Sequence, residues 1–85
     1  MRIEMELRNV PRFRVMEYLV EAGGKQTDEM GVKGENWAAW LEEMEPARVG
    51  TLSVRRDMLI IEGPDEATVS RVHAFMRQKT MRGGG

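Results

Sequence analysis

The hydrophobic positions of this chain first follow the period of a strand. Over residues 2–7, Ile3, Met5 and Leu7 alternate with charged or polar neighbours and therefore share one face. Alternation with a period of two is typical of a half-buried strand. We therefore expect the chain to begin with a strand whose apolar side faces a core.

Two further segments follow helical spacing. The first begins behind a candidate cap at Asn9, ends at the glycine pair Gly23–Gly24, and predicts a helix over residues 11–22. Its apolar positions are Phe13, Met16, Leu19 and Val20. The second begins at Pro64, where two acids follow the proline, and predicts a helix over residues 64–80. Its apolar stripe contains Val69, Val72, His73 and Met76.

The segment between these helices contains one conflict. Residues 25–33 are polar and are expected to form an edge strand, with a turn at residues 33–35. Residues 36–45 place apolar side chains at helical spacing behind a candidate cap at Asn36, and this pattern favours a helix. The alternative is a strand with Ala39 and Leu41 turned inward, which needs an irregularity to re-phase Met44.

Strand signals return after Pro46, which is expected to end the preceding element. We expect a hairpin of residues 47–54 with residues 58–62, a polar turn at residues 55–57, and a bulge or close backbone approach at Gly50. The predicted fold is an α+β domain over residues 1–80, with an antiparallel sheet and two helices packed on one face. A flexible glycine-rich tail follows over residues 81–85.

Composition narrows the class of protein. Eighty-five residues suffice for one domain with one core. The absence of cysteine excludes disulfides and thiolate metal ligands. No apolar run approaches the roughly 20 residues that span a bilayer, and the first residues do not resemble a signal peptide. We therefore expect a cytoplasmic protein with no membrane partner.

The residues that carry chemistry are few. His73 is the only imidazole, and Ser53 and Ser70 lie in no nucleophile motif. We therefore expect a non-enzymatic protein with no catalytic residues, cofactor or metal. Residues 25–66 carry five bases and ten acids, which disfavours nucleic acid as a partner. Residues 67–85 carry four bases and no acid, which the dipole of the second helix explains; docking of an anionic partner is the alternative.

The two tryptophans are the most informative aromatic residues. In a helix Trp37 and Trp40 would share the core-facing stripe, whereas in a strand they would point to opposite faces. One of them would then need cover from a second copy of the chain or from a ligand between the sheet and the C-terminal helix. The candidate ligand or partner surface consists of Trp37, Trp40, His73 and Met76.

Four short stretches together resemble a known family. They are Glu45-Pro46, Val49-Gly50-Thr51-Leu52-Ser53, Glu62-Gly63 and Arg82-Gly83-Gly84-Gly85. They resemble the MoaD-related C-terminal domain, a bacterial domain of unknown function that follows a ubiquitin-like sulfur-carrier domain. The resemblance covers nearly the whole chain and implies a TBP-like order of strand, helix, four strands and helix. In that order residues 36–45 become a strand.

The family resemblance implies a role in binding rather than an activity. It points to an accessory or interaction domain linked to sulfur-carrier or molybdopterin biosynthesis, with a sulfur carrier, an activating enzyme or a second copy as partner. Sulfur carriers end in two glycines because an unbranched terminus can thread into an adenylating enzyme. Gly83, Gly84 and Gly85 are therefore a candidate functional tail, and a frayed helix end is the alternative reading.

Overall fold

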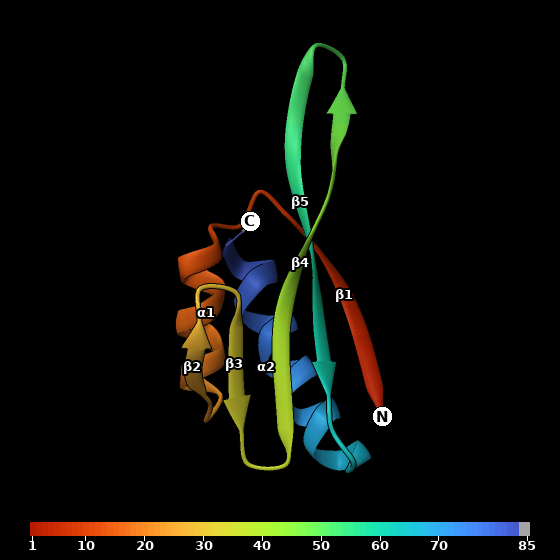
Figure 1. The fold of residues 1–85 in the computed structure, drawn as a ribbon. Coiled ribbons are helices and arrows are strands. Elements are labelled where there is room, and N and C mark those ends of the chain that lie inside the picture. Colours follow the sequence, from red (N-terminus) through yellow and green to blue (C-terminus); the bar gives the residue numbers. More distant parts are fainter. Residues whose placement is uncertain (84–85) are drawn as a thin grey trace.

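The computed structural model describes residues 1–83, in which one antiparallel sheet is covered by two helices. The elements are β1 (Arg2–Arg8), α1 (Arg12–Glu21), β2 (Lys25–Asp28), β3 (Gly31–Gly34), β4 (Trp37–Val49), β5 (Leu52–Glu62) and α2 (Glu66–Gly83). The strands lie in the order β1-β5-β4-β3-β2, and every neighbouring pair is antiparallel. Both helices lie on the same face of the sheet (Figure 1). This arrangement confirms the predicted α+β fold.

The segment for which helix and strand competed is a strand. Ala39 and Leu41 of β4 are buried, as the strand alternative required, and β4 pairs with β3 on one side and β5 on the other. The helix favoured by local spacing is therefore wrong. Hydrogen-bonded pairing along both edges of β4, together with burial of its inward side chains, outweighs the helical propensity of these residues. Asn36 does not cap a helix; it takes a positive φ of 65° in the turn that precedes β4.

The hairpin is longer than expected, and its turn lies elsewhere. β4 continues through Pro46, and the chain reverses at residues 50–51, where Gly50 adopts a φ of 64°. The expected polar turn at residues 55–57 is wrong, since these residues lie inside β5. A register shift between Met44 and Ala47 marks a bulge around Pro46. A bulge leaves a residue outside the ladder, so the missing N–H of proline can be tolerated there.

The first helix starts later than predicted and is rotated. Asn9 is not its cap: it takes a φ of 56°, and its N–H donates to the carbonyl of Arg55 at 2.9 Å, which ends β1. Pro11 holds the N-cap position without a side-chain hydrogen bond. The buried face of α1 contains Val15, Met16 and Leu19, whereas Phe13 is 62% exposed.

The polar segment after α1 forms two strands rather than one. β2 and β3 pair as a short hairpin, and the N–H of Met30 in their turn donates to Asp28 Oδ1 at 2.8 Å. The predicted edge strand is thus a small hairpin, and β2 is the edge.

The second helix begins behind a side-chain cap. Asp65 caps α2 by accepting hydrogen bonds from the N–H groups of Ala67 and Thr68. Within residues 1–83, no helix combines the length and apolar content that crossing a bilayer requires.

One core fills the space between the sheet and the helices. Most of its fully buried side chains come from both helices and from β5, and β3 and β4 add Val32 and Ala39; they include Met16, Leu19, Leu59, Ile61, Val69, Val72 and Met76. The predicted stripe of α2 is confirmed for its three aliphatic members, and His73 lies at its half-buried margin.

An ion pair fixes the start of α1 to the sheet. Asp57 is 3% exposed on the helix-covered face of β5, and it accepts two hydrogen bonds from Arg12, from Nε at 3.1 Å and from an Nη at 2.7 Å. The hydrogen bond to Asp57 also raises the pKa of Arg12. A buried carboxylate requires such a partner because solvation by water is lost.

Replacing this arginine should destabilise the fold strongly. Arg12→Met leaves the Asp57 carboxylate buried without its bidentate partner, which is among the most damaging single changes. Arg14→Met is the matched control, because the ion pair of Arg14 with Glu17 at 3.4 Å and its stacking over Phe13 are both exposed. In denaturant unfolding, Arg12→Met should lower the midpoint much further than Arg14→Met. Equal midpoints for the two variants would contradict this account of the ion pair.

The indole of Trp37 requires a glycine beneath it. A methyl group at Gly34 would overlap the Trp37 ring, and Trp37 itself is 4% exposed. Gly34→Ala should therefore lower the free energy of unfolding by about 1–3 kcal/mol, measured by urea titration. Gly50→Asn is the control, because its site is open and asparagine tolerates a positive φ. If both variants retain the wild-type stability, Trp37 does not depend on this contact.

Candidate functional site

The four residues expected to form one surface are separated by the structure. Trp37 and Met76 are core residues that are 4% and 0% exposed. Trp40 lies on the opposite face of the sheet from the helices, because neighbouring residues of β4 alternate in direction. His73 is half-buried on α2. A ligand between the sheet and the C-terminal helix therefore cannot contact Trp40 together with Met76.

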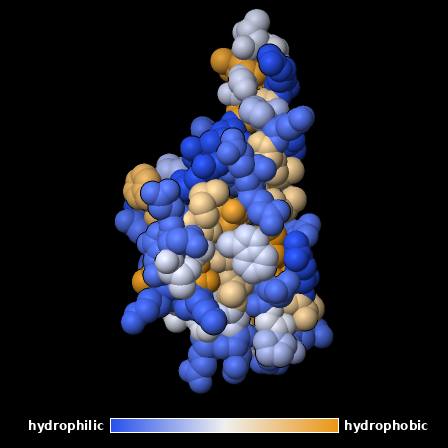
Figure 2. All heavy atoms as spheres, viewed as in Figure 1, coloured by the Kyte–Doolittle hydropathy of each residue, from blue (hydrophilic) through white to orange (hydrophobic). Residues whose placement is uncertain are grey.

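Trp40 is covered largely by its own neighbours. It pairs across the sheet with Gly31 on one side and Ile60 on the other. Its Nε1 donates to Glu42 at 3.2 Å, and the guanidinium of Arg2 lies 5.9 Å from its ring centroid. Figure 2 shows this face, on which an apolar strip runs between hydrophilic borders. Half-buried or buried side chains of the central strands, including Ile60 at 1% exposure, form the strip.

His73 is held in a partly apolar setting. Its burial, and secondarily the charge of Arg77, lower the pKa of the imidazole below its ordinary value of 6.5. Across residues 1–83, no group of three or more histidine, aspartate or glutamate side chains is placed to hold a metal ion. Gly83 is the last residue of α2, and the remaining tail residues, Gly84 and Gly85, lie outside the described residues.

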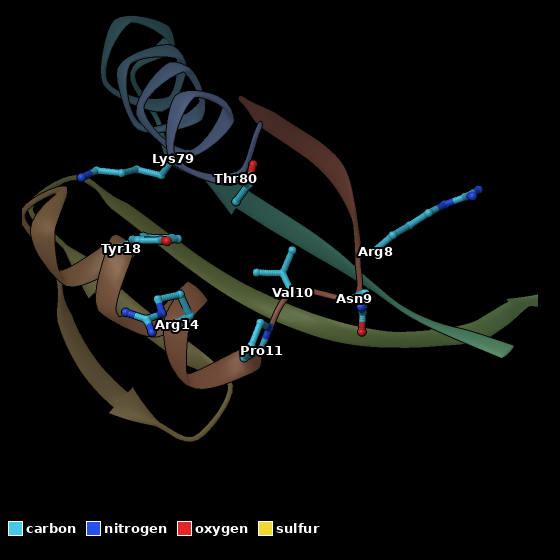
Figure 3. A pocket seen from close by; sticks show the side chains of 8 residues that line it. All are labelled: Arg8, Asn9, Val10, Pro11, Arg14, Tyr18, Lys79 and Thr80. Atoms are coloured by element: carbon cyan, nitrogen blue, oxygen red, sulfur yellow. The ribbon is translucent and has the colours of Figure 1, made fainter. Parts of the chain in front are cut away.

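A cleft opens where the two helices approach the end of β1. It has a volume of about 560 Å³ and is lined by Arg8, Asn9, Val10, Pro11, Arg14, Tyr18, Lys79 and Thr80 (Figure 3). We call it the α1–α2 cleft. Three of these eight residues are basic and none is acidic, although the whole chain carries a net charge of −1. The cleft therefore favours an anion.

Two of the three cations are placed to act within the α1–α2 cleft. The side chain of Arg8 extends away from the other lining residues in Figure 3 and is bound to Glu6 at 2.6 Å. Lys79 lies above the ring of Tyr18, with Nζ 5.8 Å from its centroid. Arg14 projects from the same helix as Tyr18. The geometry thus offers two cations around one aromatic wall.

The existing partners of these cations are weak competitors for a ligand. Arg14 pairs with Glu17 at 3.4 Å, and Lys79 pairs with Glu21 at 3.4 Å. Both pairs are long, and all four side chains are more than one-third exposed, so water screens the attraction. An incoming anion can therefore displace these carboxylates at small free-energy cost.

Sequence reasoning identified only part of this cleft. The basic segment at residues 67–85 contains Lys79. Docking of an anionic partner on this segment is the alternative hypothesis that the sequence offers for its charge. Arg14 and Tyr18 were missed, because their place beside Lys79 depends on how α1 packs against α2. The sequence does place Arg14 and Tyr18 four residues apart on one predicted helix, and this spacing puts two side chains on the same helix face.

The lowered pKa of His73 predicts a pH dependence of stability. The folded pKa lies below the unfolded value of 6.5, so between the two the unfolded chain binds more protons. The free energy of unfolding should therefore fall as the pH drops through 6.5 towards the folded pKa. His73→Gln should lose this part of the slope, measured by urea unfolding across that range. An NMR titration of the single imidazole provides the check, and a midpoint at or above 6.5 would contradict it.

Comparison with known proteins places the chain in context. A family model described as archaeal MoaD-like protein matches residues 3–85. No curated protein matches the chain. The family match confirms the MoaD-related resemblance, and the description it carries is archaeal.

Proposed function

Because this chain belongs to the archaeal MoaD-like family, we propose that it is a non-enzymatic accessory domain of sulfur-carrier or molybdopterin biosynthesis. In this role it binds a protein partner of the pathway, either an activating enzyme or a sulfur carrier. The α1–α2 cleft carries the proposal, since its lining is basic without an acidic residue and suits an anionic group on that partner.

The surroundings of the titratable groups support binding rather than catalysis. A catalytic base needs a partner that orients it and a reacting group within reach. His73 lies at the margin of the core, where burial lowers its pKa. Asp57 is the buried carboxylate of the described core, and Arg12 already neutralises it. Both groups therefore have structural explanations.

The last turns of α2 support the same contact region. Lys79 and Thr80 line the α1–α2 cleft from the last turns of α2, and that helix ends at Gly83. In the sequence, Gly84 and Gly85 follow directly. A partner that engages the glycine tail as a carrier end would thus meet the basic cleft at the same end of the helix.

Charge reversal in the cleft should weaken binding to the activating enzyme. The double variant Arg14→Glu/Lys79→Glu replaces both cations that act within the cleft, and the affinity should fall by at least about tenfold. The double variant Arg48→Glu/Lys33→Glu is the matched control, because it reverses two exposed cations that do not line the cleft. Biolayer interferometry at two salt concentrations provides the measurement. If both variants bind like the wild type, the cleft is not the contact surface.

The tail is tested separately by deleting residues 83–85. If these glycines act as a carrier terminus, the deletion should abolish adenylation by the activating enzyme, measured as exchange of pyrophosphate into ATP, while binding through the cleft persists. Unchanged adenylation would remove the carrier role and leave the accessory role. If the wild type is not adenylated and the deletion weakens binding, the tail serves only in docking.

A small-ligand role is the second candidate, and one feature of the cleft favours it. Tyr18 supplies an aromatic wall beside two cations, and the volume of about 560 Å³ is typical of small-molecule sites. An anionic ring compound would then raise the melting temperature without any partner protein. A thermal-shift screen reads this directly, and Arg14→Glu/Lys79→Glu should remove the shift.

A further inference from the structure

The β4–β5 hairpin extends beyond the rest of the molecule. β1 pairs with β5 only as far as Arg56, so residues 45–56 project as a two-stranded ribbon, which we call the arm (Figure 1). Val49 and Leu52 pair across its tip and are 58% and 66% exposed. An isolated ribbon of two strands is marginally stable in water, so these side chains are suited to a contact outside the protomer.

The apolar side chains of the arm share one face. β5 alternates without a bulge, so its residues 52, 54, 56, 58 and 60 point to the same side of the sheet. That side is turned away from the helices, because Ile60 pairs there with Trp40. Directly opposed residues share a face, which adds the β4 partners of residues 52 and 54. The apolar face of the arm thus consists of Ala47, Val49, Leu52 and Val54.

This face continues the apolar strip of the sheet, which includes Trp40, Ile60 and the half-buried Met58. Figure 2 shows apolar side chains in the strip and again along the arm up to its tip. Residues 58–61 of β5 are apolar on both faces, and such a run is typical of a strand that is covered on both sides. The helices cover one of these faces (Figure 1), and no other element of residues 1–83 covers the second.

The charges beside the strip form two adjacent rows of opposite sign. One row crosses β1, β5 and β4 with Glu6 and Glu42 at its ends, and the next row towards the arm carries Arg8 and Arg56. A two-fold axis that runs across the strands between these rows brings the acidic row of each copy over the basic row of the other. The face is therefore complementary to itself.

We propose that two copies of this chain pack antiparallel through this face, so that the arm of each copy lies over the sheet of the other. The axis places the pair Ala47–Val54 of one arm over the pair Trp40–Ile60 of the second copy. The small alanine then faces the large indole, and the isoleucine faces the valine. Because the arrangement is two-fold, it closes as a dimer.

The distribution of charge favours a second copy as the occupant. Residues 45–56 carry three arginines and one acid, a net charge of +2, so the rest of the chain carries −3. Arm against arm would bring like charges together, whereas arm against sheet brings opposite charges together. Arg48 pairs with Ser53 on the other face of the arm, so its side chain is turned away from the contact.

The contact is small. It spans about 34 Å of strand, from residue 52 to residue 62, and three strands with a total width of about 14 Å. The resulting flat area is about 480 Å² on each copy, below the roughly 800 Å² per partner of a standard interface. The dimer should therefore depend on protein concentration.

Cysteine crosslinking tests this arrangement, because the chain contains no cysteine. The axis places Leu52 over Glu62 of the second copy, and facing sheets lie about 10 Å apart. A bis-maleimide of similar length should therefore join the double variant Leu52→Cys/Glu62→Cys into a covalent dimer. Within one chain these positions are about 34 Å apart along β5, so the reagent cannot bridge them. Each single variant is a control, because its two thiols lie at opposite ends of the dimer.

The double variant should crosslink at least about tenfold faster than either single variant at equal thiol concentration. Crosslinking of Leu52→Cys alone at the rate of the double variant would indicate contact between two arms and overturn the proposal. A double variant no faster than Leu52→Cys/Ser70→Cys, whose second thiol is exposed on α2, would overturn it as well.

Sedimentation velocity provides a measurement without cysteine. The wild type should shift towards a dimer as its concentration rises, and Val49→Ser/Leu52→Ser should raise the dissociation constant at least about tenfold. Phe13→Ser/Val20→Ser is the matched control, because it removes two apolar side chains of α1 that are 62% and 44% exposed. Equal dissociation constants for the two double variants, or a monomeric wild type at every concentration, would contradict the proposal.

Discussion

β4 and β5 pair from Ala38 with Glu62 at one end to Val49 with Leu52 at the other, and this ladder places every other element of the molecule. β5 is the second strand of the sheet, and its residues 59–61 are at most 1% exposed. β1 joins the outer edge of β5, and β3 joins the outer edge of β4. The two helices then cover the face on which the inward side chains of these strands meet. Weakening the ladder would therefore expose the core from both sides.

The bulge around Pro46 allows this ladder to continue past the body of the protein. Before the bulge, Ala39 and Leu41 point towards the helices and Trp40 points away from them. After it the phase shifts by one residue, since Ala47 pairs with Val54 and Val49 pairs with Leu52. The strand alternative needed an irregularity that re-phases Met44, but the register shift lies after that residue, so Met44 keeps the phase of Trp40 and is half-buried. A proline that normally ends a strand here lies where its missing donor is not needed.

The elements that could be predicted from the sequence are those specified by local patterns. The alternation around Met5 predicts β1, and the proline and acids before residue 67 predict the start of α2 to within two residues, at Pro64 rather than Glu66. The errors occur where a distant partner changes the meaning of a local pattern. Residues 55–57 look like a polar turn, but the charge of Asp57 is neutralised by Arg12, which lies 45 residues away. The same reason explains why the cleft was only half identified, since Lys79 contributes to it only through the packing of α2 beside Tyr18.

The α1–α2 cleft and the base of the β4–β5 hairpin meet at the connection between β1 and α1. Val10 lines the cleft, and its carbonyl accepts a hydrogen bond at 2.9 Å from an Nη of Arg55 in β5. Asn9, another lining residue, donates to the carbonyl of the same arginine. These two hydrogen bonds hold the connection against the outer edge of β5, beyond the point where β1 ends. One wall of the cleft is therefore positioned by the same strand that organises the sheet.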